Sequence, residues 1–304
     1  MSIPDIRLIP FVCGAGASTA GCEHGPGYLY DAGLAGALSH ERRQVRWDVN
    51  PHHIYEAQEP YYLSLPDLGT PERRAIVMEN CRDIAERVER AVSEGATPIT
   101  VGGDHAIAAG SIAGFARAKK AHGRIGVIWV DAHADLNTFE GSVSKAMHGM
   151  SLAALLGMGD SEFASIGGSA APVLKPEHVA YVGLRDVEPQ EMATISAMNI
   201  KAFSMENVLE QGAAHIFEKA LAHVTKETDY LILSIDLDAF DPALAPAVGT
   251  PVGQGLRRRE MFVAYRRLLK EHRVDMIELV ELNPTLDGAK ETASLARDIL
   301  NTLL

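Results

Sequence analysis

The apolar run from Ile125 to Val130, which leads directly into Asp131, His133 and Asp135, constrains the fold more than any other stretch. An uninterrupted apolar run of this length predicts a strand buried on both faces, as in a parallel sheet covered by helices. Residues two apart on an extended chain point the same way. We therefore expect the two acids and the histidine to converge at the C-terminal edge of a sheet, where open α/β proteins bind ligands.

Strand-like and helix-like segments alternate along the rest of the chain. We expect strands at residues 6–12, 98–101, 125–130, 179–184, 200–203, 230–235 and 276–282. We expect helices at 28–38, 71–94, 106–121, 151–156, 189–198, 205–211, 213–225, 257–272 and 289–303, and irregular chain at 51–70. This alternation predicts an α/β fold, a parallel sheet with helices on both sides, in a single domain over residues 1–304. A barrel has the same alternation and stays open as an alternative.

Composition narrows the classes of partner. The chain has 304 residues and a formal net charge of -12, which argues against nucleic-acid binding, because that function needs a basic surface. An acidic protein suits a cationic substrate through long-range attraction. The three cysteines are odd in number and show no metal-binding spacing, which favours reduced thiols in the cytoplasm. We find no signal peptide and no apolar run long enough to span a membrane.

Six metal-ligand residues lie at the ends of three expected strands. They are His105, Asp131, His133, Asp135, Asp236 and Asp238. A lone D-x-H-x-D also occurs in turns and helix caps, so the prediction rests on the three strand ends together. Four aspartates in one cleft would repel one another unless cations were present, and six ligands are too many for one tetrahedral zinc. The set favours two Mn²⁺ ions, with Co²⁺, Ni²⁺, Fe²⁺ or Zn²⁺ as alternatives. Water held between such ions loses a proton near neutral pH, which indicates a hydrolase.

Four ordered motifs resemble the signature blocks of the ureohydrolases, the family of arginase and agmatinase, and look most like arginase. They are G-G-D-H at 102–105, D-A-H-A-D at 131–135, S-I-D-L-D-A-F-D-P at 234–242 and E-L-N-P at 281–284. The resemblance implies a three-layer α-β-α fold with a mostly parallel eight-stranded sheet and a binuclear manganese site. It assigns one ion to His105, Asp131, Asp135 and Asp236. It assigns the other to Asp131, His133, Asp236 and Asp238, so that Asp131 and Asp236 bridge the ions.

The loop after D-A-H-A-D is expected to select the substrate. Its Asn137, Ser144 and His148 match the spacing found in arginases, although Asn137 and Ser144 are also ordinary turn residues. The resemblance implies hydrolysis of L-arginine to L-ornithine and urea. It gives catalytic roles to His148, as proton donor, to Glu281, which would hold the guanidinium, and to Asp135, which would accept a hydrogen bond from the tetrahedral intermediate. It gives substrate-binding roles to Asn137, Ser144, Asp186, Glu188 and Thr250.

Two positions depart from the arginase pattern. Glu188 stands where arginases usually have Asp, and Ala146 stands where they often have Asn. Another guanidino substrate, such as agmatine or a guanidino acid, therefore stays open. Outside this family, the alternatives are a non-enzymatic protein of the same fold and an amide hydrolase resembling histone deacetylases, which would hold one zinc.

The start of the helix near residue 257 predicts self-assembly. Arg259 and Glu260 match an Arg-Glu pair that arginases place between subunits, although such a pair is also common on a solvated helix surface. A guanidinium and a carboxylate can meet their symmetric copies around a rotation axis. The resemblance therefore implies a homotrimer or homohexamer.

Overall fold

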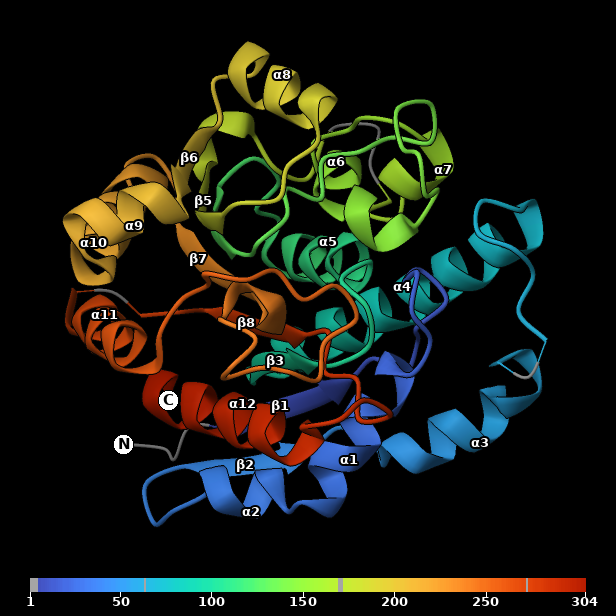
Figure 1. Cartoon of the computed structure of the whole chain (residues 1–304). Helices are drawn as coiled ribbons and strands as arrows, with labels where there is room; N and C mark the ends of the chain where they lie inside the picture. The colour runs from blue at the N-terminus through green and yellow to red at the C-terminus, as the bar shows by residue number, and fades with distance from the viewer. Residues whose placement is uncertain (1–4, 63, 169–171, 272) are drawn as a thin grey trace.

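The apolar runs form one open parallel sheet. The computed structural model describes residues 5–62, 64–168, 172–271 and 273–304. Within these residues, eight strands pair in the order β2-β1-β3-β8-β7-β4-β5-β6, and every pair is parallel (Figure 1). The strands are β1 (Asp5–Pro10), β2 (Gln44–Trp47), β3 (Thr97–Val101), β4 (Ile125–Val130), β5 (Val179–Leu184), β6 (Lys201–Ser204), β7 (Tyr230–Asp236) and β8 (Met276–Val280). Because β2 and β6 are the two edges and do not pair with each other, the barrel alternative is wrong.

Helices cover both faces of the sheet and complete three layers (Figure 1). The α-helices are α1 (Gly25–Asp31), α2 (Leu34–Leu38), α3 (Pro51–Tyr62), α4 (Pro71–Ser93), α5 (Ile107–Lys119), α6 (Ser151–Leu155), α7 (Ser161–Ala164), α8 (Pro189–Ala197), α9 (Met205–Gln211), α10 (Ala213–Val224), α11 (Arg258–Glu271) and α12 (Ala289–Leu303). Short 3-10 turns are η1 (Cys22–His24), η2 (Met147–Met150), η3 (Pro176–His178) and η4 (Leu237–Ala239). Over the described residues, no helix combines the length and apolarity that crossing a bilayer requires.

A separate hydrophobic core lies on each face of the sheet. Val127 and Trp129 of β4 pack with α4 and α5, whereas Ile128 and Val130 of the same strand pack with α10, α11 and α12. This alternation follows from the two-residue period of a strand. It explains why β4 is apolar throughout, as expected for a strand covered on both sides.

The expected elements differ from the observed ones near the N-terminus. The single helix expected at 28–38 is two helices, because Gly33 adopts a left-handed φ of 74° between them. The segment expected to be irregular at 51–70 contains helix α3. Strand β2 was missed because its four residues lie at the sheet edge and expose Gln44 and Arg46, so the sequence shows no apolar run.

Helices α4 and α5 touch backbone to backbone through two glycines. A Cβ built on Gly110 would lie 2.1 Å from the carbonyl oxygen of Cys81, and one on Gly114 would lie 2.1 Å from that of Ala85. The obstructing atoms belong to the backbone of α4 and cannot rotate away. The G-x-x-x-G spacing in α5 therefore allows α4 and α5 to pack in close contact within the hydrophobic core on their face of the sheet.

We expect Gly114→Ala to lower the free energy of unfolding by about 1–3 kcal/mol, because overpacking outweighs the gain in helix propensity. Gly36→Ala in α2 is the matched control, since its Cβ would meet nothing within 4 Å. That control is expected to stabilise the chain by about 0.5–1 kcal/mol. Urea unfolding of both variants measures the difference. A Gly114→Ala chain as stable as the control would show that the helices are not in close contact.

Candidate metal centre and substrate pocket

The sheet order brings the expected site residues together. Strands β3, β8, β7, β4 and β5 are consecutive neighbours in the sheet and run in the same direction. Their C-terminal ends therefore form one edge. The residues that follow them include His105 after β3, Glu281 after β8, Asp238 after β7 and Asp131 after β4. Segments far apart in the sequence thus supply one cluster.

The turn after β3 is shaped by glycines. Gly102 and Gly103 both have positive φ, 75° and 68°, and a Cβ on Gly103 would lie 2.5 Å from the Cys13 carbonyl oxygen. Glycine meets both demands without strain. The turn delivers His105 to the sheet edge, where its ring stacks on Trp129 with 4.3 Å between centroids and an interplanar angle of 13°.

Three carboxylates surround one nitrogen of His105. Its Nδ1 lies 3.0 Å from Asp131 Oδ2, 3.0 Å from Asp135 Oδ2 and 3.2 Å from Asp236 Oδ2. Nevertheless, within the described residues, His105 Nδ1 and Asp135 Oδ2 are buried without a hydrogen bond. Ligands about 2.1 Å from an octahedral ion lie about 3 Å from one another. The arrangement is therefore that of ligands around a cation.

A second group adjoins the first and shares Asp131. His133 Nδ1 lies 3.0 Å from Asp238 Oδ2 and 3.5 Å from Asp131 Oδ1. Of the described residues, two groups can hold a metal ion, namely His105 with Asp131 and Asp236, and His133 with Asp131 and Asp238. All six residues expected as ligands thus meet at one place. Asp131 belongs to both groups, whereas Asp236 belongs to the first.

The carboxylates of this cluster repel one another, and bound cations would stabilise their ionised forms. Burial, followed by repulsion from Asp238 and Asp131, raises the pKa of Asp236 well above its usual value. Burial and the charge of Asp131 likewise raise the pKa of Asp135. Carboxylates packed this closely are ionised only if cations neutralise them. The donor set, rich in carboxylate oxygen with two imidazoles, fits divalent metal ions.

We call the six candidate ligands the metal cluster. Glu281 and His148 form a pair beside it. Glu281 has a positive φ of 70°, and its Oε1 accepts the backbone N–H of His105 at 2.9 Å and lies 3.0 Å from His148 Nδ1. Its Oε2 is buried and, among the described residues, has no hydrogen-bond partner. Burial alone would lower the pKa of His148, but the hydrogen bond and charge of Glu281 raise it to about 9. The contact with Glu281 therefore favours the protonated form of His148.

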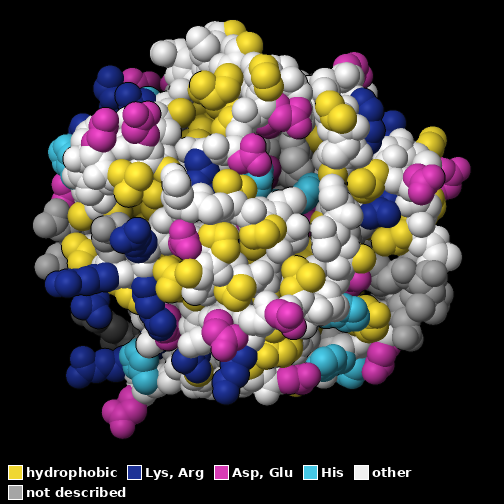
Figure 2. All heavy atoms as spheres, in the orientation of Figure 1, with side chains coloured by type: hydrophobic (Ala, Val, Ile, Leu, Met, Phe, Trp, Pro, Cys, Tyr) yellow, Lys and Arg dark blue, Asp and Glu magenta, His cyan; other side chains and the backbone are white. Residues whose placement is uncertain are grey.

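A pocket of about 250 Å³ opens beside this pair. In the space-filling view, a hollow on this face shows histidine atoms at depth and acidic side chains at its edge (Figure 2). The pocket contains all the expected substrate-binding residues. Its lining includes Asn137, Ser144, Asp186, Glu188 and Thr250, together with His133, Asp135, Ala146 and His148.

Four further lining residues were not predicted from the sequence, namely Ser18, Ser142, Gly149 and Glu191. Glu191 joins two pocket segments, because its carboxylate accepts the backbone N–H of Leu136 at 3.0 Å and that of Glu188 at 3.0 Å. Burial raises its pKa to about 7, against these two hydrogen bonds. The sequence signal was present, since a Glu three residues after a helix N-cap often bonds back to that residue.

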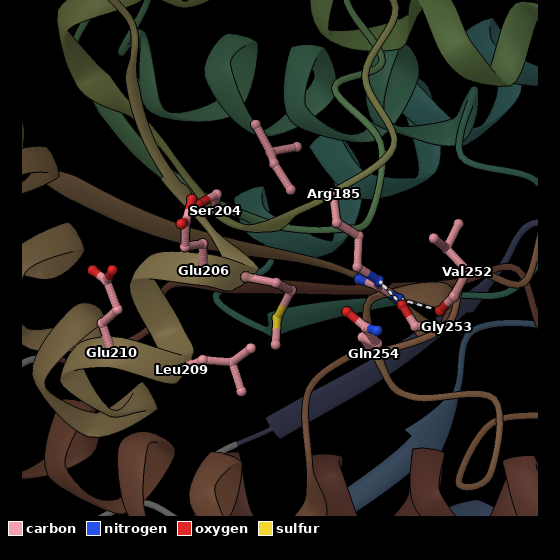
Figure 3. A pocket seen from close by; sticks show the side chains of 10 residues that line it. Arg185, Ser204, Glu206, Leu209, Glu210, Val252, Gly253 and Gln254 are labelled. Atoms are coloured by element: carbon pink, nitrogen blue, oxygen red, sulfur yellow. Dashed lines mark hydrogen bonds between the residues drawn. The ribbon is translucent and has the colours of Figure 1, made fainter.

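The side chain of Arg185 forms hydrogen bonds with three segments that border the site. All of its N–H groups donate to carbonyl oxygens, those of Gly183 and Ala239 at 3.2 Å, Asp238 at 2.7 Å, Val252 at 2.8 Å and Gly253 at 3.0 Å. Figure 3 shows its guanidinium directed at the loop of Val252 and Gly253, in a second pocket of about 750 Å³. Thr250, in the same loop, donates to Asp238 Oδ2 at 3.1 Å. The end of β5 thus holds the loop beside the metal cluster.

The chain is similar in sequence and in structure to known arginases. The arginase of Bacillus caldovelox is 37% identical over 300 residues, which cover 98% of this chain and 97% of that protein. Arginase-2, mitochondrial, of Rattus norvegicus is 34% identical, with 98% of this chain and 84% of that protein covered. A crystal structure of arginase from Bacillus subtilis superposes with a TM-score of 0.87 and 32% identity, over 99% of this chain and 98% of that one. A model described as the arginase family matches residues 4–304, so the chain belongs to the arginase family.

Proposed function

We propose that this chain hydrolyses the guanidinium group of L-arginine to give L-ornithine and urea. The observation that carries the proposal is the Oε2 of Glu281, which among the described residues has no hydrogen-bond partner and lies buried beside the metal cluster and next to His148. A guanidinium offers two N–H groups to a carboxylate in this position. Relatives named arginase, 37% identical over nearly the whole chain, support L-arginine as the substrate. Agmatine or a guanidino acid is the alternative.

We propose two Mn²⁺ ions per chain as the cofactor. The structure supports a metal, because two groups of ligands share Asp131. The ions would be held by His105, Asp131, His133, Asp135, Asp236 and Asp238, and Co²⁺, Ni²⁺, Fe²⁺ or Zn²⁺ are the alternatives. When bound, such ions lower the pKa of water and stabilise negative charge on oxygen.

The remaining residues bind, orient and protonate the substrate. Glu281 would hold the guanidinium so that its carbon faces Asp135 and the metal cluster. His148 would donate a proton to the departing alkylamine, which is a poor leaving group without one. At the far end of the pocket, Asn137 and Ser144 would donate to the carboxylate of an amino acid. Acidic residues would accept its ammonium group, and Asp186 and Glu188 line the pocket there.

A urea-release screen tests the substrate. We expect the highest kcat/KM with L-arginine, because agmatine lacks the carboxylate that Asn137 and Ser144 would bind. Guanidinobutyrate and guanidinopropionate lack the ammonium group instead, and formiminoglutamate completes the panel. Higher kcat/KM with agmatine would favour the alternative substrate. Release of urea or formamide from none of the compounds would reject the proposal.

His148→Asn is expected to lower kcat about tenfold or more while KM changes little, because a proton donor acts mainly in the transition state. The amide keeps a polar group near Glu281 but carries no acidic proton. Initial rates of urea release at neutral pH measure both constants. An unchanged kcat would leave His148 as a packing residue of the loop.

We further propose that residues 1–304 form one catalytic domain that assembles as a homotrimer or homohexamer. Arg259 is exposed near the start of α11, while the side chain of Glu260 lies outside what the structure describes. An Arg at a symmetric interface can pair with carboxylates of a neighbouring copy. Light scattering at micromolar concentration is expected to give a multiple of three chains, and a smaller particle for Arg259→Ala. A monomeric wild type would reject the assembly.

A further inference from the structure

Glu278 is a buried carboxylate that the proposed reaction does not use. It lies in the middle of β8, in the centre of the sheet, and is 0% exposed. Among the described residues it forms no ion pair with Lys or Arg. Its carboxylate is surrounded by hydroxyl groups of Thr100, Ser111 and Ser234, which come from β3, α5 and β7. Burying a carboxylate without a cationic partner costs free energy, which the hydrogen bonds from these three hydroxyl groups offset in part.

One of these hydroxyls connects Glu278 to the metal cluster. Ser234 Oγ donates to Glu278 Oε2 at 2.8 Å, and the same oxygen lies 2.8 Å from His105 Nε2. A serine hydroxyl has one hydrogen, so once it is given to Glu278 the oxygen can only accept from His105. His105 must then carry its proton on Nε2. Its Nδ1, on the other side of the ring, is left with a lone pair directed at Asp131, Asp135 and Asp236.

We propose that Glu278 is a positioning residue which, through Ser234, fixes the Nε2–H tautomer and the orientation of His105 for metal binding. The inference rests on the metal centre proposed above, though not on the identity of the substrate. A histidine that binds a metal commonly donates its other N–H to an outer partner that sets its tautomer. Here the partner is a hydroxyl whose direction is set by a buried carboxylate.

The stacking contact of the ring does not fix its tautomer. Stacking on Trp129 restrains the tilt of His105, but a stacked neighbour does not distinguish one ring nitrogen from the other. Without the Glu278 acceptor, the Ser234 hydroxyl is free to donate to Nε2. The ring proton would then move to Nδ1, and a metal ion would have to displace it. Loss of Glu278 is therefore expected to weaken metal binding rather than to remove a ligand.

Mn²⁺ binding by the full chain tests the inference. The metal-free protein, prepared with a chelator, is titrated with Mn²⁺, and free Mn²⁺ is counted by electron paramagnetic resonance. We expect Ser234→Ala and Glu278→Met each to weaken one of two Mn²⁺ sites about 10- to 100-fold. The double variant should be no weaker than Ser234→Ala alone, because both changes break the same chain of hydrogen bonds. Glu278→Gln, which keeps an acceptor oxygen for Ser234, should restore most of the affinity.

Ser111→Ala is the matched control, because Ser111 contacts the other carboxylate oxygen of Glu278 and does not reach His105. We expect its Mn²⁺ affinity to stay within about twofold of wild type, even if its stability falls. Equal weakening by Ser111→Ala, or additive effects of Ser234→Ala and Glu278→Met, would overturn the inference. If Glu278→Met does not fold, wild-type affinity in Ser234→Ala would overturn it alone. A wild-type chain that binds no Mn²⁺ would reject the metal centre, and the inference with it.

Discussion

Asp131→Asn is expected to abolish most of the activity and to loosen both metal ions at once. Both oxygens of Asp131 are used, since Oδ2 lies 3.0 Å from His105 Nδ1 and accepts the indole N–H of Trp129 at 3.1 Å. Its Oδ1 accepts the backbone N–H of His133 at 2.7 Å. An amide would remove one negative charge shared by two ligand groups and would turn an N–H donor toward one of them. We expect turnover to fall at least about a hundredfold.

The number of bound metal ions distinguishes Asp131, which belongs to both ligand groups, from a residue that belongs to only one. His105→Asn changes a residue of the first group only, so it should deplete one ion and leave the other. Asp83→Asn, on the exposed side of α4, controls for the loss of one acidic charge. Elemental analysis after dialysis, together with urea release, measures all three variants. If Asp131→Asn kept two ions and full turnover, the two-metal proposal would be wrong.

The candidate metal ligands could be identified in the sequence because their signals are local. Asp131, His133 and Asp135 follow an apolar strand at two-residue intervals, and such spacing survives any arrangement of the rest of the chain. The order of the strands is not local. Only the structure shows that β8 lies between β3 and β7 and so places Glu281 beside His105.

The roles of Ser18, Ser142 and Glu278 could not be predicted from the sequence, because they depend on tertiary contacts. Ser18 and Ser142 reach the pocket because of the paths that two loops take, and the loops carry no periodic pattern that predicts those paths. Glu278 was visible in its strand, but its significance depends on Ser111 and Ser234, which are far away in the sequence. Contacts of this kind arise from tertiary packing, which single-sequence patterns do not contain.

Backbone strain at the site was equally invisible in the sequence. Asp135 and Glu281 have positive φ values of 50° and 70°, which non-glycine residues rarely adopt. Both residues lie at the exit of a central strand and turn a carboxylate toward the cluster. Such strain persists only where the surrounding structure enforces it, and it is common at functional sites. The two positions therefore support a functional role independently of the motifs.

Glu281→Gln is expected to lower kcat/KM for L-arginine by a factor of about 30 to several thousand, which corresponds to about 2–5 kcal/mol. The change is nearly isosteric, so the left-handed turn and the hydrogen bond from the His105 N–H can persist. The substrate guanidinium, however, would meet a neutral amide in place of the buried carboxylate that we propose binds it. Steady-state rates of urea release measure the loss.

The same variant should also lower the pKa of His148, because Glu281 raises the pKa of that imidazole to about 9. With a neutral neighbour, burial dominates and the pKa of His148 falls, so less of the proposed proton donor is in its acid form at neutral pH. Since Glu281 is not among the proposed metal ligands, Mn²⁺ content should stay at the wild-type level. Loss of activity with loss of Mn²⁺ would instead place Glu281 in support of the metal cluster. Wild-type kcat/KM would exclude it from guanidinium binding.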